Sequence, residues 1–187
     1  MEHEVKVNEP YLFLDDELIA QQQGLSRYTG KAEKWSGNPI LKADRPWEGK
    51  CVLLWGSVIR DFADDTFKIW YLAYNPLMGM PYSTQLCYAT SKGGIEWERP
   101  HLGVYTFEGK KDNNIIFRDN NHKFDSPTVM IDPFDPPEAE RFKMTTFSGT
   151  NKKLMRYASP DGFTGKSWDL WISERSRLQI GTRCSLM

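Results

Sequence analysis

The chain has 187 residues, a length that suffices for one domain with a sizeable hydrophobic core. Its formal net charge is −1 and its Lys and Arg residues are scattered, so the sequence lacks the basic patch typical of nucleic-acid-binding proteins. No apolar run approaches the roughly 18 residues of a membrane span, and residues 1–4 do not resemble a signal peptide, so we expect a cytoplasmic protein without nucleic-acid or membrane partners.

Strand-length segments separated by turn residues predict an all-β fold. In the first half, the segments rich in β-branched and aromatic residues are 51–60, 67–74, 85–90 and 95–97. In the second half, the corresponding segments are 128–131, 141–147, 154–158 and a short stretch near Trp168. Helix signals are weak, because only residues 18–23 could form one or two turns before Gly24 would end them.

The two halves of the chain follow one template with a period near 70 residues. Each half contains the same short motifs in the same order, and such a repeat predicts a repeated structural unit. The matched pairs are Asn38-Pro39-Ile40-Leu41 with Asn113-Asn114-Ile115-Ile116, Ser57-Val58-Ile59-Arg60-Asp61 with Thr128-Val129-Met130-Ile131-Asp132, Phe67-Lys68-Ile69 with Phe142-Lys143-Met144, Tyr88-Ala89-Thr90 with Tyr157-Ala158-Ser159, Gly94 with Gly162, and Trp97 with Trp168. Four short antiparallel strands per repeat describe one blade of a β-propeller.

Only two such blades are visible, whereas propellers close with typically four to eight. We therefore interpret the chain as an incomplete propeller. Residues 1–34 form an N-terminal strand or closing segment, residues 35–105 the first blade, residues 106–172 the second blade, and residues 173–187 a tail that matches nothing in the repeat. Two blades leave open strand edges and exposed apolar faces, which predicts self-association.

Several motifs together resemble one enzyme group. They are the opening Leu12-Phe13-Leu14-Asp15-Asp16, Asn38-Pro39-Ile40-Leu41, Trp47-Glu48, Ser57-Val58-Ile59, Tyr88-Ala89-Thr90-Ser91 with Gly93-Gly94-Ile95-Glu96-Trp97, and Phe124-Asp125-Ser126-Pro127-Thr128-Val129. From about residue 11 to residue 168, the chain resembles the first two blades of the five-bladed β-propeller glycoside hydrolase superfamily. That group includes invertase-like and arabinanase-like enzymes, mannoside phosphorylases, and bacterial proteins of the glycosyl hydrolase family 32 N-terminal-like type.

The resemblance implies a sugar-binding funnel at the propeller axis, lined by carboxylates from the innermost strands of successive blades. Glycosidic cleavage needs one carboxyl group that protonates the leaving oxygen and another, ionised, that attacks or activates water. Asp125 matches the second-blade position, where the carboxylate usually orients the substrate or tunes the acid. Its alternative role is an Asx turn before Pro127. The third-blade Glu, which is normally the proton donor, has no counterpart here.

The first blade lacks the expected acid. Counting back from Ser57 places Leu54 opposite Asp125, so the inner strand carries no carboxylate in that register. Asp16, next to Asp15, could replace it if the opening strand enters the funnel. We favour the alternative, because an Asp-Asp pair in this context is typical of a hairpin turn or a helix cap.

Aromatic and imidazole side chains are the candidate substrate-binding groups. Trp55 precedes Ser57 on the expected inner strand, and its ring is a candidate platform for the C–H face of a sugar. Trp47 lies in a loop that either borders the funnel or is an ordinary surface loop. His122, three residues before Asp125, either reaches the funnel mouth or is merely solvated.

The remaining aromatic residues and the thiols are assigned to structure. Trp70 and Tyr74 share one strand face, and Trp97 and Trp168 recur at the repeat period, so we place them in the core. Cys51 and Cys87 fall inside strand patterns and are most simply buried thiols. None of the three His residues lies at metal-ligand spacing with Cys, so we expect no metal site and no cofactor.

Two functions remain open. The first is a glycoside hydrolase, or a phosphorylase in which phosphate replaces water, acting on an oligosaccharide. The second is a noncatalytic propeller that binds carbohydrate or protein, because one fold hosts many functions and only the site decides. Asp125 and Trp55 favour the first, and Leu54 in the acid position favours the second. We expect the 187-residue chain itself to be inactive, since two blades do not surround a substrate.

Overall fold

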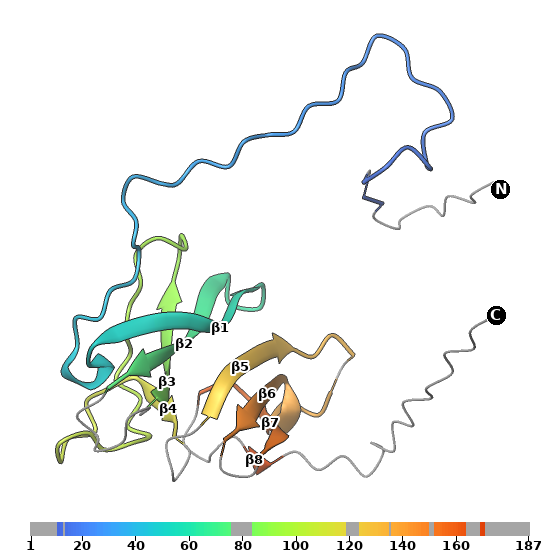
Figure 1. Ribbon diagram of the computed structural model, residues 1–187. Coiled ribbons are helices and arrows are strands. Elements are labelled where there is room, and N and C mark those ends of the chain that lie inside the picture. The colour runs from blue at the N-terminus through green and yellow to red at the C-terminus, as the bar shows by residue number, and fades with distance from the viewer. Residues whose placement is uncertain are drawn as a thin grey trace. The chain divides into compact units, whose positions relative to one another are not determined.

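The protein is described by a computed structural model that covers residues 11–12, 14–75, 84–118, 124–134, 136–149, 152–163 and 169–170 (Figure 1). The chain divides into two units, residues 1–36 and residues 37–187, and both sheets belong to the second unit. Its described elements are eight strands and two short 3-10 helices, Pro46–Glu48 (η1) and Glu138–Glu140 (η3). The all-β prediction is therefore confirmed. No described helix is long and apolar enough to cross a membrane.

The first sheet contains four antiparallel strands in the order β1-β2-β3-β4. Its strands are β1 (Cys51–Asp61), β2 (Thr66–Tyr74), β3 (Thr84–Ser91) and β4 (Ile115–Phe117). Strand β2 is buried along nearly its whole length because both faces of the sheet are covered. Three of these strands match the sequence prediction to within a residue or so at each end.

The fourth strand differs from the prediction. The segment Ile95–Trp97 was expected to complete the sheet, but it forms a turn, and only the neighbouring Glu98 makes an isolated bridge to Thr90. Strand β4 takes that place, 20 residues further along, so the expected boundary at residue 106 does not separate the two sheets. The physical reason is burial: pairing with β3 places Ile115 and Ile116 at 0% and 2% exposure.

The second sheet repeats the antiparallel order with β5, β6, β7 and β8. Its strands are β5 (Phe124–Ile131), β6 (Phe142–Ser148), β7 (Lys153–Ser159) and β8 (Asp169–Leu170). Strand β5 begins four residues earlier than the sequence predicts, and the extra residues carry the acidic side chain of interest, Asp125. The first strands of the two sheets, β1 and β5, are neighbours (Figure 1).

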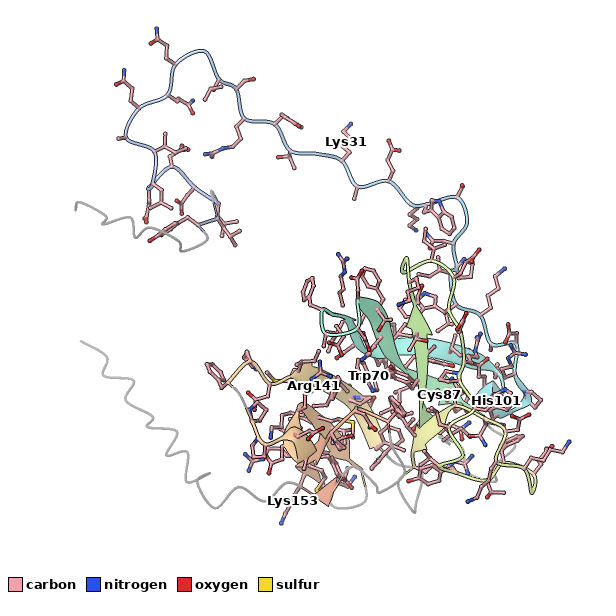
Figure 2. The ribbon with its side chains drawn as sticks, turned by 180° about the vertical axis from the view of Figure 1, so that it is seen from behind. Lys31, Trp70, Cys87, His101, Arg141 and Lys153 are labelled. Carbon is pink, nitrogen blue, oxygen red and sulfur yellow. The ribbon has the colours of Figure 1, made fainter. Side chains whose placement is uncertain are left out.

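Side chains from both sheets form one hydrophobic core between them. Its buried members are Trp70, Leu72, Leu86, Tyr88, Ile116, Phe124, Val129, Phe142 and Met144. Hydrogen bonds cross the junction as well: among them, Trp70 Nε1 donates to the carbonyl of Gly162 at 2.8 Å, and the N–H of Val129 donates to Ser57 Oγ at 2.8 Å. Figure 2 labels Trp70 and Arg141 at this junction. Trp70 is fully buried, as its assignment to the core predicts.

The opposite face of the first sheet is covered by the segment that leads into β1. Glu48 is fully buried there, and its Oε1 accepts hydrogen bonds from Tyr71 Oη at 2.6 Å and Arg99 Nε at 2.7 Å. Its Oε2 accepts from the backbone N–H groups of Asp44 and Arg45. Because every oxygen of this buried carboxylate is bonded, the network holds η1 against the sheet.

In the third strand of each sheet, the residues that are structurally equivalent are shifted by one position from the residues that the sequence repeat matches. Phe67 pairs with Ser91 and Phe142 with Ser159, so these two serines are equivalent. Each serine Oγ accepts the N–H of the glycine three residues later, at 2.8 Å and 3.0 Å. Tyr88 and Tyr157 are therefore not equivalent, and a one-residue offset turns them to opposite faces of their sheets. Both consequently contact the shared core.

Candidate functional site

An open groove of about 370 Å³ joins the first strands of the two sheets. It is lined by Trp55, Gly56, Asp125, Ser126, Pro127 and Thr128. Trp55 and Asp125 are 70 positions apart in the sequence yet share this groove, and the sequence analysis singled out both on separate grounds. The structure therefore brings together the candidate aromatic platform and the candidate carboxylate.

Irregularities in the strand pairing create the groove. The pairing of β1 with β2 is interrupted between Leu53 and Ser57, and that of β5 with β6 between Asp125 and Thr128. Bulges of this kind re-aim side chains and are common next to functional sites. In β1, the bulge requires Gly56, because a Cβ there would lie 2.0 Å from the carbonyl oxygen of Trp70.

The two bulges differ in length, and this changes the expected register. Leu53 pairs with Leu72, while Asp125 pairs with Phe147 at the equivalent position of the second sheet. The residue equivalent to Asp125 is thus Leu53 rather than Leu54, because the β1 bulge holds one residue more. The inner strand of the first sheet still offers no carboxylate at that position.

Local hydrogen bonds orient the carboxylate of Asp125. Its Oδ1 accepts the N–H of Ser126 at 2.7 Å and Ser126 Oγ at 3.3 Å, while its backbone carbonyl accepts Thr146 Oγ1 at 2.8 Å. Ser126 adopts φ 49°, a left-handed conformation that costs a non-glycine residue energy and is enriched at functional sites. Asp125 is exposed in the groove, and its carboxylate accepts the N–H of the adjacent Ser126 and not that of residue 127, which is a proline without an N–H.

The groove combines one aromatic ring with several oxygen atoms. Trp55 is 57% exposed, which leaves its ring accessible. The hydroxyl groups of Ser126 and Thr128 accompany the Asp125 carboxylate along the opposite wall, and neither was singled out from the sequence. Among the described residues, no Lys or Arg forms an ion pair with Asp125. The arrangement can stack a flat apolar surface and bond hydroxyl groups beside it.

The structure places Trp47 away from this groove. Its Nε1 donates to Asn114 Oδ1 at 2.6 Å, its ring meets Phe107 edge-on, and its carbonyl accepts the side-chain amide of Gln85. These contacts fasten η1 to the first sheet. Trp47 is not among the residues that line the groove, so the structure does not bring it together with Trp55 and Asp125.

The structure does not place the two remaining candidates relative to the groove. Asp16 belongs to the unit of residues 1–36, where its Oδ1 pairs with Arg27 Nη2 at 2.5 Å. The neighbouring Asp15 Oδ1 accepts the N–H of Glu17 at 3.1 Å, which is the turn that the sequence analysis favoured. His122 lies outside the described residues.

A buried ion cluster at the junction of the sheets was not predicted from sequence. Asp61 Oδ2 lies 2.5 Å from Lys68 Nζ, and Asp61 Oδ1 lies 2.6 Å from Arg141 Nη2 of the second sheet. Burial by itself would raise the pKa of Asp61, but hydrogen bonds from Arg141 and Lys68 outweigh it and lower the pKa to about 2. The cluster joins the sheets and is structural.

Metal and thiol chemistry receive no support within the described residues. They contain no group of three or more His, Cys, Asp or Glu side chains that could hold a metal ion. Cys87 is buried, and burial raises the pKa of its thiol, so it is an inert core group. Comparisons of the chain with protein-family models, with curated proteins and with solved structures found no match.

Proposed function

We propose that the groove between β1 and β5 binds a saccharide and that the chain is part of a carbohydrate-active β-propeller of the glycoside hydrolase type. The observation that supports this proposal is the meeting of Trp55 and Asp125 in one groove. They come from the first strands of two consecutive four-stranded antiparallel sheets, which correspond to the innermost strands of two blades.

The chemistry of the groove suits a sugar. An exposed indole offers a large, rigid apolar surface to the C–H face of a pyranose or furanose ring. A carboxylate accepts hydrogen bonds from sugar hydroxyl groups, and the Ser126 and Thr128 hydroxyls both donate and accept. A mostly apolar site with a few placed polar groups is the usual composition of a small-ligand pocket.

Hydrolysis is the second candidate, favoured by the Asp125 carboxylate. Cleavage of a glycosidic bond requires two carboxyl groups about 5–10 Å apart, whereas the described lining of the groove contributes one. In this reading Asp125 is the residue that orients the substrate, and the proton donor comes from a further blade. Saccharide binding is the function that the described residues support directly.

Titration of the full chain with oligosaccharides tests the proposal. Mannan, arabinan and fructan oligosaccharides represent the substrates of the enzymes that the chain resembles, and isothermal titration calorimetry measures their affinity. Trp55→Ala should weaken binding at least tenfold, which corresponds to about 1.4 kcal/mol. Phe62→Ala is the control, because Phe62 is an aromatic residue of the same unit that is 81% exposed and does not line the groove.

The results for these variants distinguish saccharide binding from hydrolysis. Equal affinity of Trp55→Ala and the unmodified chain, or no binding of any of the three sugars, would contradict a saccharide site. If Asp125 is catalytic, Asp125→Asn should abolish hydrolysis of a bound sugar while changing the free energy of unfolding by less than about 1 kcal/mol. A parallel loss of activity and stability would instead assign Asp125 to a structural turn.

A further inference from the structure

Each sheet has an inner face, which contacts the shared core, and an outer face, which points away from it. The outer face of the second sheet carries residues equivalent to those on the inner face of the first sheet. Strand registers make Ile59, Leu72 and Leu86 of the first sheet equivalent to Met130, Phe147 and Leu154 of the second. Leu72 and Leu86 are fully buried between the sheets, whereas Met130, Phe147 and Leu154 are 49%, 39% and 74% exposed. We call these last three residues face A. These apolar side chains thus lie where the repeat positions them for a contact, and the described residues of one chain do not make that contact.

The outer face of the first sheet is the counterpart. The second sheet contributes Val129, Phe142 and Met144 to the core, and the equivalent residues of the first sheet are Val58, Phe67 and Ile69. These three, which we call face B, line an open apolar groove of about 580 Å³ together with residues 38–41. Val58 is 46% exposed there, whereas Val129 is 3% exposed at the junction of the sheets. Ile69 is only 4% exposed, because Leu41 and Trp97 of the same chain already pack against its cluster, so Val58 and Phe67 are the accessible members of face B.

One chain therefore carries both halves of an interface that it already forms once internally. We propose that a second copy of this chain places its face B on face A of the first copy, in the arrangement that the two sheets adopt within the chain. The hydroxyl of Thr128, equivalent to Ser57, then accepts the N–H of the second copy's Val58, as Ser57 accepts that of Val129. The occupant is a second copy because this chain supplies a sheet with the matching face.

Charge is compatible with this arrangement. Tyr88 stacks on Phe163 with ring centroids 5.0 Å apart, and the register makes Arg156 equivalent to Tyr88 and Ile95 equivalent to Phe163. Arg156 of one copy therefore approaches Ile95 of the next, beside the exposed carboxylate of Glu96.

The new interface is weaker than the internal one. The fully buried Trp70 is replaced by Thr145 in the second sheet, so the contact lacks the largest aromatic side chain of the core. The association is heterologous, because face A meets face B and not itself, and such contacts close into rings or extend as filaments. A ring of whole copies contains an even number of sheets, so it differs from the five-bladed arrangement of the enzymes that the chain resembles.

Light scattering coupled to size-exclusion chromatography tests the proposal with the full chain between about 1 and 200 μM. The unmodified chain should show a mass that rises with concentration above 21.7 kDa. Leu154→Lys blocks face A and Val58→Lys blocks face B, so each variant alone should remain monomeric. An equimolar mixture of the two should form a complex of two chains and nothing larger, because it retains one intact face A and one intact face B.

Control variants distinguish this interface from nonspecific association and from misfolding. Phe134→Lys removes an apolar side chain that is 88% exposed in the turn after β5, and it should leave the association unchanged. If Val58→Lys does not melt cooperatively, Leu54→Lys replaces it, since Leu54 is 58% exposed and lines the same groove. A monomeric unmodified chain at 200 μM, variants that associate like the unmodified chain, or a mixture that stays monomeric would each overturn the proposal.

Discussion

Removing the carboxylate of Asp61 should destabilise the junction of the two sheets. The side chain of Asp61 is 2% exposed and lies between Lys68 of the first sheet and Arg141 of the second. Asp61→Asn keeps the shape of the side chain but deletes its charge. Lys68, whose side chain is 8% exposed, then retains only the half-exposed Asp64 carboxylate at 2.7 Å. The variant therefore isolates the charge that joins the two sheets.

The pKa shift and the burial of Asp61 set the size of the expected loss of stability. The pKa of Asp61 falls from its ordinary 3.8 to about 2 because the two cations outweigh the effect of burial. A shift of this size corresponds to roughly 2 kcal/mol of folding stability. Breaking a fully buried ion pair costs roughly 3–5 kcal/mol, but Asp64 still compensates Lys68, and Arg141 can turn toward solvent. We expect Asp61→Asn to lower the free energy of unfolding by roughly 2–3 kcal/mol.

Urea denaturation followed by circular dichroism measures this loss, and pH changes it in a defined direction. A carboxyl group whose pKa is lower in the folded state stabilises the fold above its unfolded pKa, and this contribution disappears as pH falls. The difference in the free energy of unfolding between the unmodified chain and Asp61→Asn should have its full value near pH 6 and should shrink from about pH 4 toward pH 2. Asp65→Asn is the control, because Asp65 is 71% exposed in its pair with Arg60. A difference below 0.5 kcal/mol at about pH 6, or one that grows on acidification, would refute the reasoning.

Two further substitutions test the groove and the buried network. Gly56→Ala should cost roughly 2–3 kcal/mol, because its Cβ would lie 2.0 Å from the Trp70 carbonyl oxygen, while Gly93→Ala, which meets open space, should stay within about 0.5 kcal/mol in thermal melts. Glu48→Gln should cost roughly 2–3 kcal/mol in the same assay, because it leaves the guanidinium of Arg99, 7% exposed, with only the exposed carboxylate of Asp44 at 3.5 Å. A melting temperature unchanged by Glu48→Gln would show that the network does not hold η1.

The bulges in β1 and β5 decide which residues meet in the groove, and the sequence does not predict them. Trp55 and Asp125 were both proposed from the sequence, Trp55 from its expected place on an inner strand and Asp125 from the motif that carries the resemblance. Their meeting in one groove depends on how far each bulge displaces its strand, which no local pattern records. Counting from Ser57 chose Leu54 as the equivalent of Asp125, whereas the pairing of Leu53 with Leu72 sets the true register. The contact of Trp47 with Asn114 spans 67 positions of the chain, so no local pattern predicts it.

The sequence by itself determined the all-β class and the positions of six strands, because alternating apolar residues and turn residues act over only a few neighbours. The tertiary structure decided which strand closes the first sheet, how the two sheets pack and which charges meet between them. Strand β4 has only three residues, too few for a pattern, and it becomes a strand by pairing with β3 and burying Ile115. The Asp61 cluster likewise joins residues 80 positions apart. Such contacts follow from burial and pairing across the whole chain, and these act only when the sheets have packed.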